Sequence, residues 1–505
     1  MSVLGTIIKE STKYSGYKIR KKKSNSNQEE ILRNLLSKAS NTEYGIRNNF
    51  QNLLKEWNVK IEFRDKVPLQ TYESLYSWIE KSLNGEKNIL WPGEIKFFAL
   101  SSGTTKGSSK KIPVSDQMIK QFQKTSLEQL LTLHKLNLST AFYESSVLTL
   151  GGCTKLKKYD NHFEGDLSGI LQKNKSFVYK PFSKPSQKIS QIENWEEKMK
   201  QIILKAPSWN IGVVAGVPTW VIKLFEGIKD HYQIKSIHEI WPNFRLYLHG
   251  GVFLGNYQDK IDSFCEKPIY YQNTYLASEG YFAYQHQPRN QGLNLLLKNG
   301  IYFEFIPKQF FDKVEEGNLH AVKTLTIDEI EPNQKYALVI STISGLWRYI
   351  IGDVVKFTCV ESFEIEIIGR ISHYLNMAGE HVSAANMNKA LVNTAKMFDI
   401  QIDEFCVVVS EKKDRHLWYV GTSKILNEHH MAIILDNELR SLNDDYNELR
   451  KSIIKLPKVK ILPTQKFYDF LASKNKIGGQ NKFPRVLNHM QRIEWERFLT
   501  SAAWI

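Results

Sequence analysis

The sequence predicts an α/β fold with a large N-terminal domain of β-sheets and helices and a smaller α+β C-terminal domain. Strand-like runs such as FRLYLHGGVF and YALVISTI alternate with helix-like stretches such as NWEEKMKQIILKA, and this alternation is typical of α/β proteins. The pattern changes after about residue 370, where a second domain is expected. The length of 505 residues also exceeds that of one ordinary domain.

The composition is that of a folded, basic protein. Hydrophobic residues make up 42% of the chain and aromatic residues 12%, which excludes a wholly disordered or fibrous protein. The formal net charge of +15 indicates an anionic partner. A nucleotide, an acidic substrate, a membrane surface and nucleic acid all satisfy that description.

The cysteines and the apolar runs bear on location. Widely spaced cysteines without a CxxC pair predict neither a zinc site nor disulfides, and they fit the reducing cytoplasm. We expect a small core residue at each of these positions: Cys153, Cys265, Cys359 and Cys406. The N-terminus lacks the apolar core of a signal peptide, and no apolar run is long enough to predict a membrane span.

The first 60 residues have a helical and basic pattern. Their run KIRKKK, Lys18 to Lys23, is typical of a solvated helical surface, with nucleic acid or lipid contact as the alternative. No zinc-finger, helix-turn-helix or RNP signature accompanies it, so we expect no nucleic-acid partner.

Residues 90–135 predict a strand, a polar loop, a second strand and a helix. The apolar run 95–100 has strand length, and Ser115 followed by Asp116 is typical of a helix N-cap and first turn. The loop SSGTTKGSSK lies between the strands. Its hydroxyls, backbone N–H groups and glycines suit phosphate oxygens. It is neither a Walker loop nor a dinucleotide fingerprint, so a hairpin turn without a ligand is the alternative.

The segment FFALSSGTTKGSSKKIPVS resembles the first motif of the auxin-responsive-promoter family of acyl-acid amido synthetases. That family belongs to the adenylate-forming superfamily, with acyl-CoA synthetases and luciferases. The resemblance implies that the loop holds the β- and γ-phosphates of ATP through Ser101, Ser102, Gly103, Thr104 and Thr105. Nearby positive charge would come from Lys106, Lys110 or Lys111.

The segment YLASEG resembles the family's second motif, Tyr-x-x-Ser-Glu. The resemblance implies that Tyr275 stacks on adenine, Ser278 donates to the α-phosphate and Glu279 holds Mg²⁺. These roles suit an aromatic ring, a hydroxyl and a carboxylate. A core aromatic and a surface ion pair are the alternatives for Tyr275 and Glu279.

The segment WRYIIGD resembles the third motif, with Trp347 where the family often has tyrosine. The resemblance implies that Asp353 accepts both ribose hydroxyls, and a turn aspartate is the alternative. Arg370 lies in a Gly-Arg pair that resembles a superfamily contact to ribose or phosphate. Two weaker matches, WPNFRLYLHGGVF and GVPTW, resemble the strand beside adenine and a loop near the acyl pocket.

The resemblance also implies an adenylation domain over 1–378 and a small domain over 379–505, with a hinge near 379–381. His381 stands at the hinge where relatives often have lysine. A histidine there would titrate near neutrality, and a plain loop histidine is the alternative.

Near the C-terminus, GGQNKFPR resembles the family's Gly-Gln-x-Lys-x-Pro-Arg segment. The resemblance implies that Lys482 reaches the acyl carboxylate and the α-phosphate during adenylation. A compact mobile cation suits that step because it neutralises the charge that develops on the transferred group. Lys474 and Lys476 are nearby competitors.

Together the motifs imply an AMP-forming ligase that uses ATP and Mg²⁺. It would adenylate a carboxylic acid and transfer the acyl group to an amine, that of an amino acid. The alternatives are an acyl-CoA ligase with the same first step, a basic nucleic-acid-binding protein, and a pseudoenzyme that binds nucleotide without turnover.

Overall fold

The computed structural model describes residues 3–22, 28–101, 110–136, 138–175, 180–251, 254–286, 292–371, 382, 384–412, 414–424, 426–474, 483–487 and 489–501. The chain forms two compact units, the first made of Met1–Val252 with Asp262–Glu366 and the second of Phe253–Ile261 with Ile367–Ile505. The predicted hinge near 379–381 lies outside the described residues.

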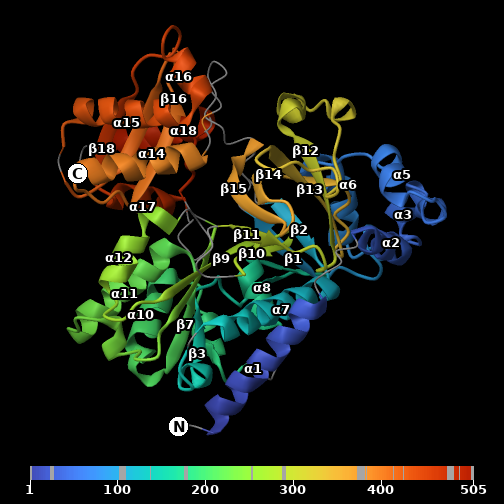
Figure 1. The fold of residues 1–505 in the computed structure, drawn as a ribbon, viewed down its shortest axis with the longest axis horizontal. Helices are drawn as coiled ribbons and strands as arrows, with labels where there is room; N and C mark the ends of the chain where they lie inside the picture. The colour runs from blue at the N-terminus through green and yellow to red at the C-terminus, as the bar shows by residue number, and fades with distance from the viewer. Residues whose placement is uncertain are drawn as a thin grey trace. The chain divides into compact units, whose positions relative to one another are not determined.

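The central element is an eleven-stranded mixed sheet (Figure 1). In sheet order its strands are β12 (Ile301–Pro307), β13 (Lys335–Thr342), β14 (Tyr349–Cys359), β15 (Glu364–Arg370), β11 (Leu293–Leu295), β10 (Gly280–Tyr284), β9 (Tyr270–Ala277), β8 (Leu246–Gly250), β7 (Ile211–Ala215), β3 (Ser146–Thr149) and β6 (Ser183–Lys184). The strands from β9 to β6 pair in parallel, and the other pairings whose register is established are antiparallel. This mixture of long sheet and helices confirms the α/β class.

The apolar character of the strands explains their place in the sheet. The strand β13 reads KYALVIST and is buried along nearly its whole length, as expected for a strand covered on both faces. The strand β12 is similarly buried, and helix α2 packs against it.

A smaller four-stranded sheet has the order β2 (Lys110–Val114), β1 (Phe97–Ser101), β5 (Phe163–Gly165) and β4 (Lys157–Lys158). The strands β1 and β2 form a hairpin in which Ser101 faces Lys110. The two predicted strands and the helix that follows them are therefore confirmed, whereas the loop residues 102–109 lie outside the described residues. The side chain of Ser115 caps this helix by accepting from the Met118 N–H at 3.1 Å.

Helices surround these sheets. In the first unit they are α1 (Val3–Lys22), α2 (Gln28–Ala39), α3 (Glu43–Arg47), α4 (Phe50–Leu53), α5 (Val59–Lys66), α6 (Tyr72–Leu83), α7 (Asp116–Leu131), α8 (Leu167–Lys173), α9 (Gln187–Ser190), α10 (Trp195–Lys205), α11 (Pro218–Tyr232) and α13 (Phe311–Glu315). The predicted N-terminal helix is thus confirmed, whereas the structure does not describe the side chains of the basic run from residue 18 to 23. None of the described helices is long and apolar enough to cross a membrane.

The second unit is α+β. Its sheet has the order β16 (Glu404–Val409), β17 (His416–Gly421) and β18 (Lys458–Leu462), and its helices are α14 (Ala384–Met397), α15 (Glu428–Leu442), α16 (Asp444–Leu449), α17 (Gln465–Ser473) and α18 (His489–Ser501). The helices α15 and α16 are separated at Asn443, whose side chain accepts from the Tyr446 N–H and caps α16. Helix α12 (Gln258–Ser263) begins within this unit and ends in the first.

One expectation about the cysteines is wrong. Only Cys406 is buried, and Cys153, Cys265 and Cys359 are partly exposed. These three positions lie in or beside loops and strand ends, where short side chains are only partly covered.

Candidate functional site

Asp353 lies in a bulged part of β14. On β13 the paired residues Ala337 and Val339 are separated by one residue. Their partners on β14, Val354 and Ile350, are separated by three, so β14 bulges between them. Gly352 lies in this bulge with a φ of +85°, a left-handed conformation that glycine tolerates. Because bulges redirect neighbouring side chains, Asp353 leaves the regular alternation of the strand at this point.

Tyr275 on β9 reaches this carboxylate. Its hydroxyl donates to Oδ2 of Asp353 at 2.5 Å. Three strands separate β9 from β14 in the sheet, and neighbouring strands lie about 4.8 Å apart, so the sheet must curve strongly for the two side chains to meet. The tyrosine ring is 6% exposed and packs on Phe282, with ring centroids 4.9 Å apart. The fold therefore joins a residue of the second motif to one of the third.

Ser278 and Glu279 form the two-residue turn between β9 and β10. Ser278 is half-buried, and Glu279 is only 8% exposed, which is unusual for a carboxylate in a turn. In the described part of the chain, no group of three or more His, Cys, Asp or Glu side chains is arranged to hold a metal ion. Glu279 thus places a buried carboxylate in the turn that carries the second motif.

The loop of the first motif leaves the end of β1. Ser101 is the last residue of that strand and is half-buried. The other four predicted phosphate contacts, Ser102, Gly103, Thr104 and Thr105, lie outside the described residues, as does Lys106.

The two lysines that follow the loop have protein partners. The Lys110 ammonium lies 5.2 Å from the centroid of the Tyr72 ring, and Lys111 pairs with Glu164 at 2.6 Å. Burial opposes the ionisation of Glu164, but hydrogen bonds from Lys111 and His162 lower its pKa. The charge of Lys111 is thus compensated within the protein.

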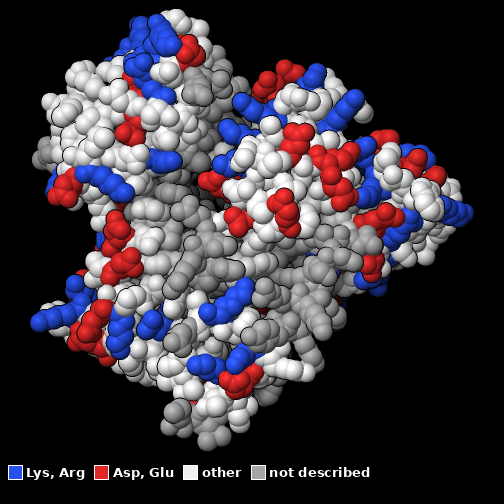
Figure 2. Space-filling model, viewed as in Figure 1, with Lys and Arg blue, Asp and Glu red and all other residues white. Residues whose placement is uncertain are grey.

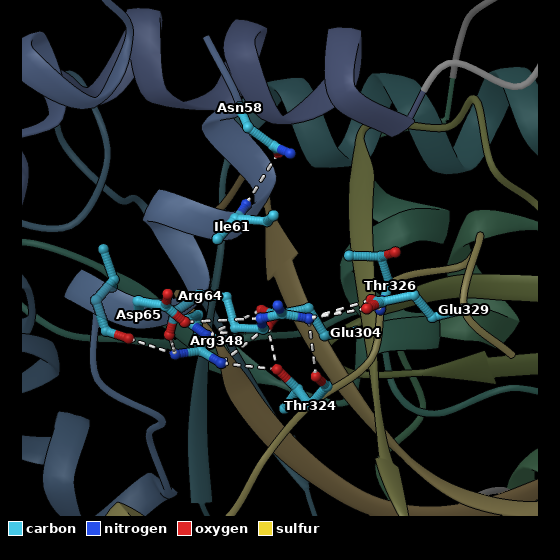
Figure 3. A network of polar contacts seen from close by, with 10 residues as sticks. Asn58, Ile61, Arg64, Asp65, Glu304, Thr324, Thr326, Glu329 and Arg348 are labelled. Atoms are coloured by element: carbon cyan, nitrogen blue, oxygen red, sulfur yellow. Dashed lines mark hydrogen bonds and ion pairs between the residues drawn. The ribbon is translucent and has the colours of Figure 1, made fainter. Parts of the chain in front are cut away.

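Arg348, which follows Trp347 in the third motif, is a buried structural residue that the sequence reasoning did not single out. Its Nε and Nη2 donate to the Glu304 carboxylate at 2.8–3.1 Å, and Nη2 also donates to Thr324 at 2.9 Å (Figure 3). Its Nη1 donates to the backbone carbonyls of Arg64 and Val67. Arg348 and Glu304 are 4% and 1% exposed, so both charges are held in the interior.

The same network fastens helix α5 to the sheet. Arg64 on α5 donates to Glu329 at 3.1 Å and to the carbonyl of Thr324 at 3.3 Å, as Figure 3 shows. Arg348 has a φ of +43°, which is uncommon for a residue other than glycine and is tolerated where many contacts fix it. The Arg348 guanidinium therefore joins α5, β12 and the start of β14.

Trp347 precedes this arginine and is fully buried. Its indole N–H donates to the carbonyl of Leu90 at 3.0 Å, and its ring packs against Phe50 with centroids 4.7 Å apart. The tryptophan in place of tyrosine is thus a core residue of the first unit.

Some of the remaining predicted residues are described by the structure, and the others lie outside the described residues. Arg370 is the half-buried last residue of β15. His381, Lys476 and Lys482 lie outside the described residues. Lys474, a competitor for the role of Lys482, pairs with Glu494 at 3.0 Å.

His249 lies one residue before the glycine pair that ends β8. Burial lowers its pKa from the ordinary value to about 4, so the imidazole is neutral at neutral pH. The hydroxyl of Thr274 donates to the backbone carbonyl of His249 at 3.0 Å and fastens this strand end to β9. The strand that the resemblance places beside adenine therefore has an uncharged histidine near its end.

Comparison with solved structures shows the fold. The chain superposes on the GH3.15 acyl acid amido synthetase with a TM-score of 0.78 and 18% identity, over 97% of this chain and 96% of that one. A 2-hydroxyisobutyryl-CoA ligase in complex with 2-HIB-AMP gives a TM-score of 0.58 at 12% identity, over 93% and 91% of the two chains.

Comparison with sequences identifies the relatives. The chain is 22% identical to the indole-3-acetic acid-amido synthetase GH3.4 of Arabidopsis thaliana over 91% of its length and 89% of that protein. It is also 22% identical to the jasmonoyl–L-amino acid synthetase GH3.5 of Oryza sativa subsp. japonica, over 84% and 86% of the two chains.

Family models cover most of the chain. The GH3 family N-terminal domain matches residues 18–156 and 138–269, the central domain matches 294–370, and the C-terminal domain matches 385–491. These matches confirm the resemblance that the motifs indicated, and the chain belongs to the GH3 family.

Proposed function

We propose that this protein is an ATP-dependent acid–amino acid ligase. A carboxylate is a poor acyl donor because its oxygen is a poor leaving group. In the first step the carboxylate attacks the α-phosphorus of ATP, pyrophosphate leaves and an acyl-AMP forms. In the second step an amine attacks the acyl carbonyl, an amide forms and AMP leaves. The GH3 family membership and the acid-amido synthetase names of the relatives support this sequence of reactions.

The observation that carries the proposal is the Tyr275–Asp353 contact. A carboxylate with one oxygen held by a tyrosine hydroxyl at 2.5 Å is fixed in orientation. In our proposal Asp353 accepts hydrogen bonds from the ribose hydroxyls, and Tyr275 holds Asp353 for that role while its ring faces adenine. Binding energy used to position ATP in this way lowers the barrier of the first step.

The phosphates would be held by the loop that leaves β1, with Ser101, Ser102, Gly103, Thr104 and Thr105, and by Ser278. We propose that Arg370, at the end of β15, contacts the ribose or a phosphate, and we place His381 near the α-phosphate. Lys482 would neutralise the charge that develops on the α-phosphate during attack.

Mg²⁺ fits this arrangement through Glu279. Protein sites for Mg²⁺ in nucleotide enzymes use one or two carboxylates together with substrate phosphates and water. The buried turn offers one carboxylate at Glu279, which matches that donor set. When bound, the ion would neutralise phosphate charge.

The proposed domains are an adenylation domain over 1–378 and a small domain over 379–505 that rotates about 379–381. We also place the reaction in the cytoplasm, where ATP is available and where the free cysteines of the described chain would stay reduced.

An acyl-CoA ligase is the second candidate, because the fold is shared with the 2-hydroxyisobutyryl-CoA ligase. The two candidates differ only in the nucleophile of the second step. Nucleic-acid binding has less support, since Figure 2 shows basic and acidic side chains interspersed over the visible face of the described residues.

The experiment is AMP release from Mg²⁺-ATP and pooled carboxylic acids, with amino acids or CoA added separately. We expect release that depends on an acid pool and rises with amino acids. A rise with CoA alone would establish the second candidate. Asp353→Ala protein should lose release in either case, and Tyr446→Phe protein should keep it.

A further inference from the structure

A short segment from the middle of the chain belongs to the second unit. Phe253–Ile261 packs with Ile367–Ile505 although it lies more than 100 residues earlier, and its residues 254–256 contact helix α14. Tyr257 is its anchor and is 1% exposed. The tyrosine hydroxyl donates to the carbonyl of Asp403 at 3.0 Å and accepts from Nη2 of Arg485 at 3.1 Å.

Arg485 is fixed on its other sides as well. Its Nη1 donates to Glu404 at 2.6 Å and to the carbonyl of Phe405 at 3.0 Å, and its guanidinium lies 4.4 Å from the centroid of the Phe405 ring. Burial opposes the arginine charge, but Glu404 and Tyr257 outweigh this effect and raise the pKa of Arg485. Burial likewise raises the pKa of Tyr257, so its hydroxyl keeps its proton for the Asp403 carbonyl.

The chain around Arg485 pairs with β16 through an isolated parallel bridge between Val407 and Val486. The Val407 N–H on β16 donates to the carbonyl of Arg485 at 2.8 Å, and the Leu487 N–H donates to the carbonyl of Val407 at 3.0 Å. Phe483 is 3% exposed and packs against Trp495, with centroids 5.0 Å apart. The residue that directly follows Lys482 in sequence is therefore fixed in the core of the second unit.

We propose that Tyr257 is a positioning residue for adenylation, and that it acts through Arg485 on the chain that carries Lys482. This inference rests on the proposed role of Lys482. Without the tyrosine hydroxyl, a buried guanidinium N–H loses its partner, and such a loss weakens every contact that depends on the arginine. The bridge between the segment Phe483 to Leu487 and β16 then opens more often, and Lys482 spends less time in the orientation that neutralises the α-phosphate.

The test compares Tyr257→Phe with Tyr446→Phe. Both substitutions remove one buried hydroxyl from the second unit, and that of Tyr446 donates to Asp436 at 2.7 Å, away from Arg485. Hydrogen exchange of the peptide that contains Leu487 reports directly on the bridge to β16, because the Leu487 N–H donates to the Val407 carbonyl. We expect roughly tenfold faster exchange in Tyr257→Phe and no change in Tyr446→Phe.

Activity gives the second readout. The probe is the carboxylic acid that gives the fastest wild-type ATP–pyrophosphate exchange in a pool of aryl, indole, short-chain and fatty acids. In Tyr257→Phe protein the exchange rate should fall roughly tenfold with little change in the KM for ATP. Amide formation from the synthetic adenylate of the same acid and mixed amino acids should keep the wild-type rate, because Lys482 acts in the first step.

Three results would overturn the inference. The first is unchanged hydrogen exchange at Leu487 in Tyr257→Phe. The second is an equal fall in both half-reactions, which indicates a general loss of structure. The third is pyrophosphate exchange that is lost in Lys482→Ala but retained in Tyr257→Phe. Wild-type protein without any pyrophosphate exchange would instead refute the proposed function, while hydrogen exchange at Leu487 would still decide whether Tyr257 stabilises the bridge to β16.

Discussion

Removal of the Glu304 carboxylate tests whether the arginine of the third motif is structural. In Glu304→Gln protein the Arg348 guanidinium would stay buried without its counter-ion, since the other acceptors around it are the Thr324 hydroxyl and two backbone carbonyls. Breaking a buried ion pair from one side costs about 3–5 kcal/mol. The side chains are 4% and 1% exposed, so solvent cannot replace the lost partner.

Thermal unfolding measures this cost. The entropy of unfolding is about 2.1 cal/mol/K per residue, so in a unit of about 350 residues 1 kcal/mol shifts the midpoint by roughly 1.3 °C. We therefore expect the midpoint of Glu304→Gln protein to fall by roughly 4–7 °C. Glu43→Gln is the matched control, because it breaks the exposed pair with Lys81 at 2.6 Å and should leave the midpoint unchanged. ATP binding at a temperature where both proteins are folded should be near normal.

Two results would contradict a structural role for Arg348. One is a Glu304→Gln midpoint equal to that of the wild-type protein. The other is an Arg348→Lys protein that unfolds normally but no longer turns over ATP, since that would place the guanidinium in the reaction.

Three further predictions concern the site. Asp353→Ala should lose ATP-dependent activity by orders of magnitude. Tyr275→Phe should lower kcat/KM roughly tenfold to a hundredfold, because a hydrogen bond to a charged group contributes about 1.5–3 kcal/mol. Near-normal steady-state rates in either variant would contradict the ribose role of Asp353. Lys482→Ala should slow pyrophosphate exchange far more than it weakens nucleotide binding measured by calorimetry, and an unchanged rate would transfer the role to another lysine such as Lys476. Because the folded-state pKa of His249 is lowered to about 4, the unfolded chain binds more protons below about pH 6.5, and stability falls as the pH is lowered through that window. The loss should reach about 3 kcal/mol near pH 4, and His249→Gln should remove this component from denaturation curves, whereas an identical pH dependence in both proteins would show that His249 is not buried as a neutral base.

The motifs identified the family because each motif is a short run of neighbouring residues whose side chains suit one chemical role. The strands that flank the first motif and the helix cap at Ser115 depend on neighbouring residues, so the sequence predicts them well. The contact between Tyr275 and Asp353 depends on a curved sheet and a bulge, and the sequence indicated only that both residues serve one nucleotide.

Contacts between buried residues that lie far apart in the chain could not be predicted from the sequence. The third motif includes Arg348, but the sequence indicated no role for it, because its partners Glu304 and Thr324 lie 44 and 24 residues away in the chain. The packing of Tyr257 with the second unit could not be predicted either, since nothing in its local sequence indicates a partner near residue 485. Such contacts follow from the topology rather than from periodicity or composition.

The most direct test of the central claim is ATP–pyrophosphate exchange with Mg²⁺ and pooled carboxylic acids, in wild-type and Asp353→Ala protein. We expect exchange in the wild-type protein that depends on one acid pool and is lost in the variant. Wild-type protein that binds no ATP, or exchange that survives intact in Asp353→Ala, would contradict the central claim.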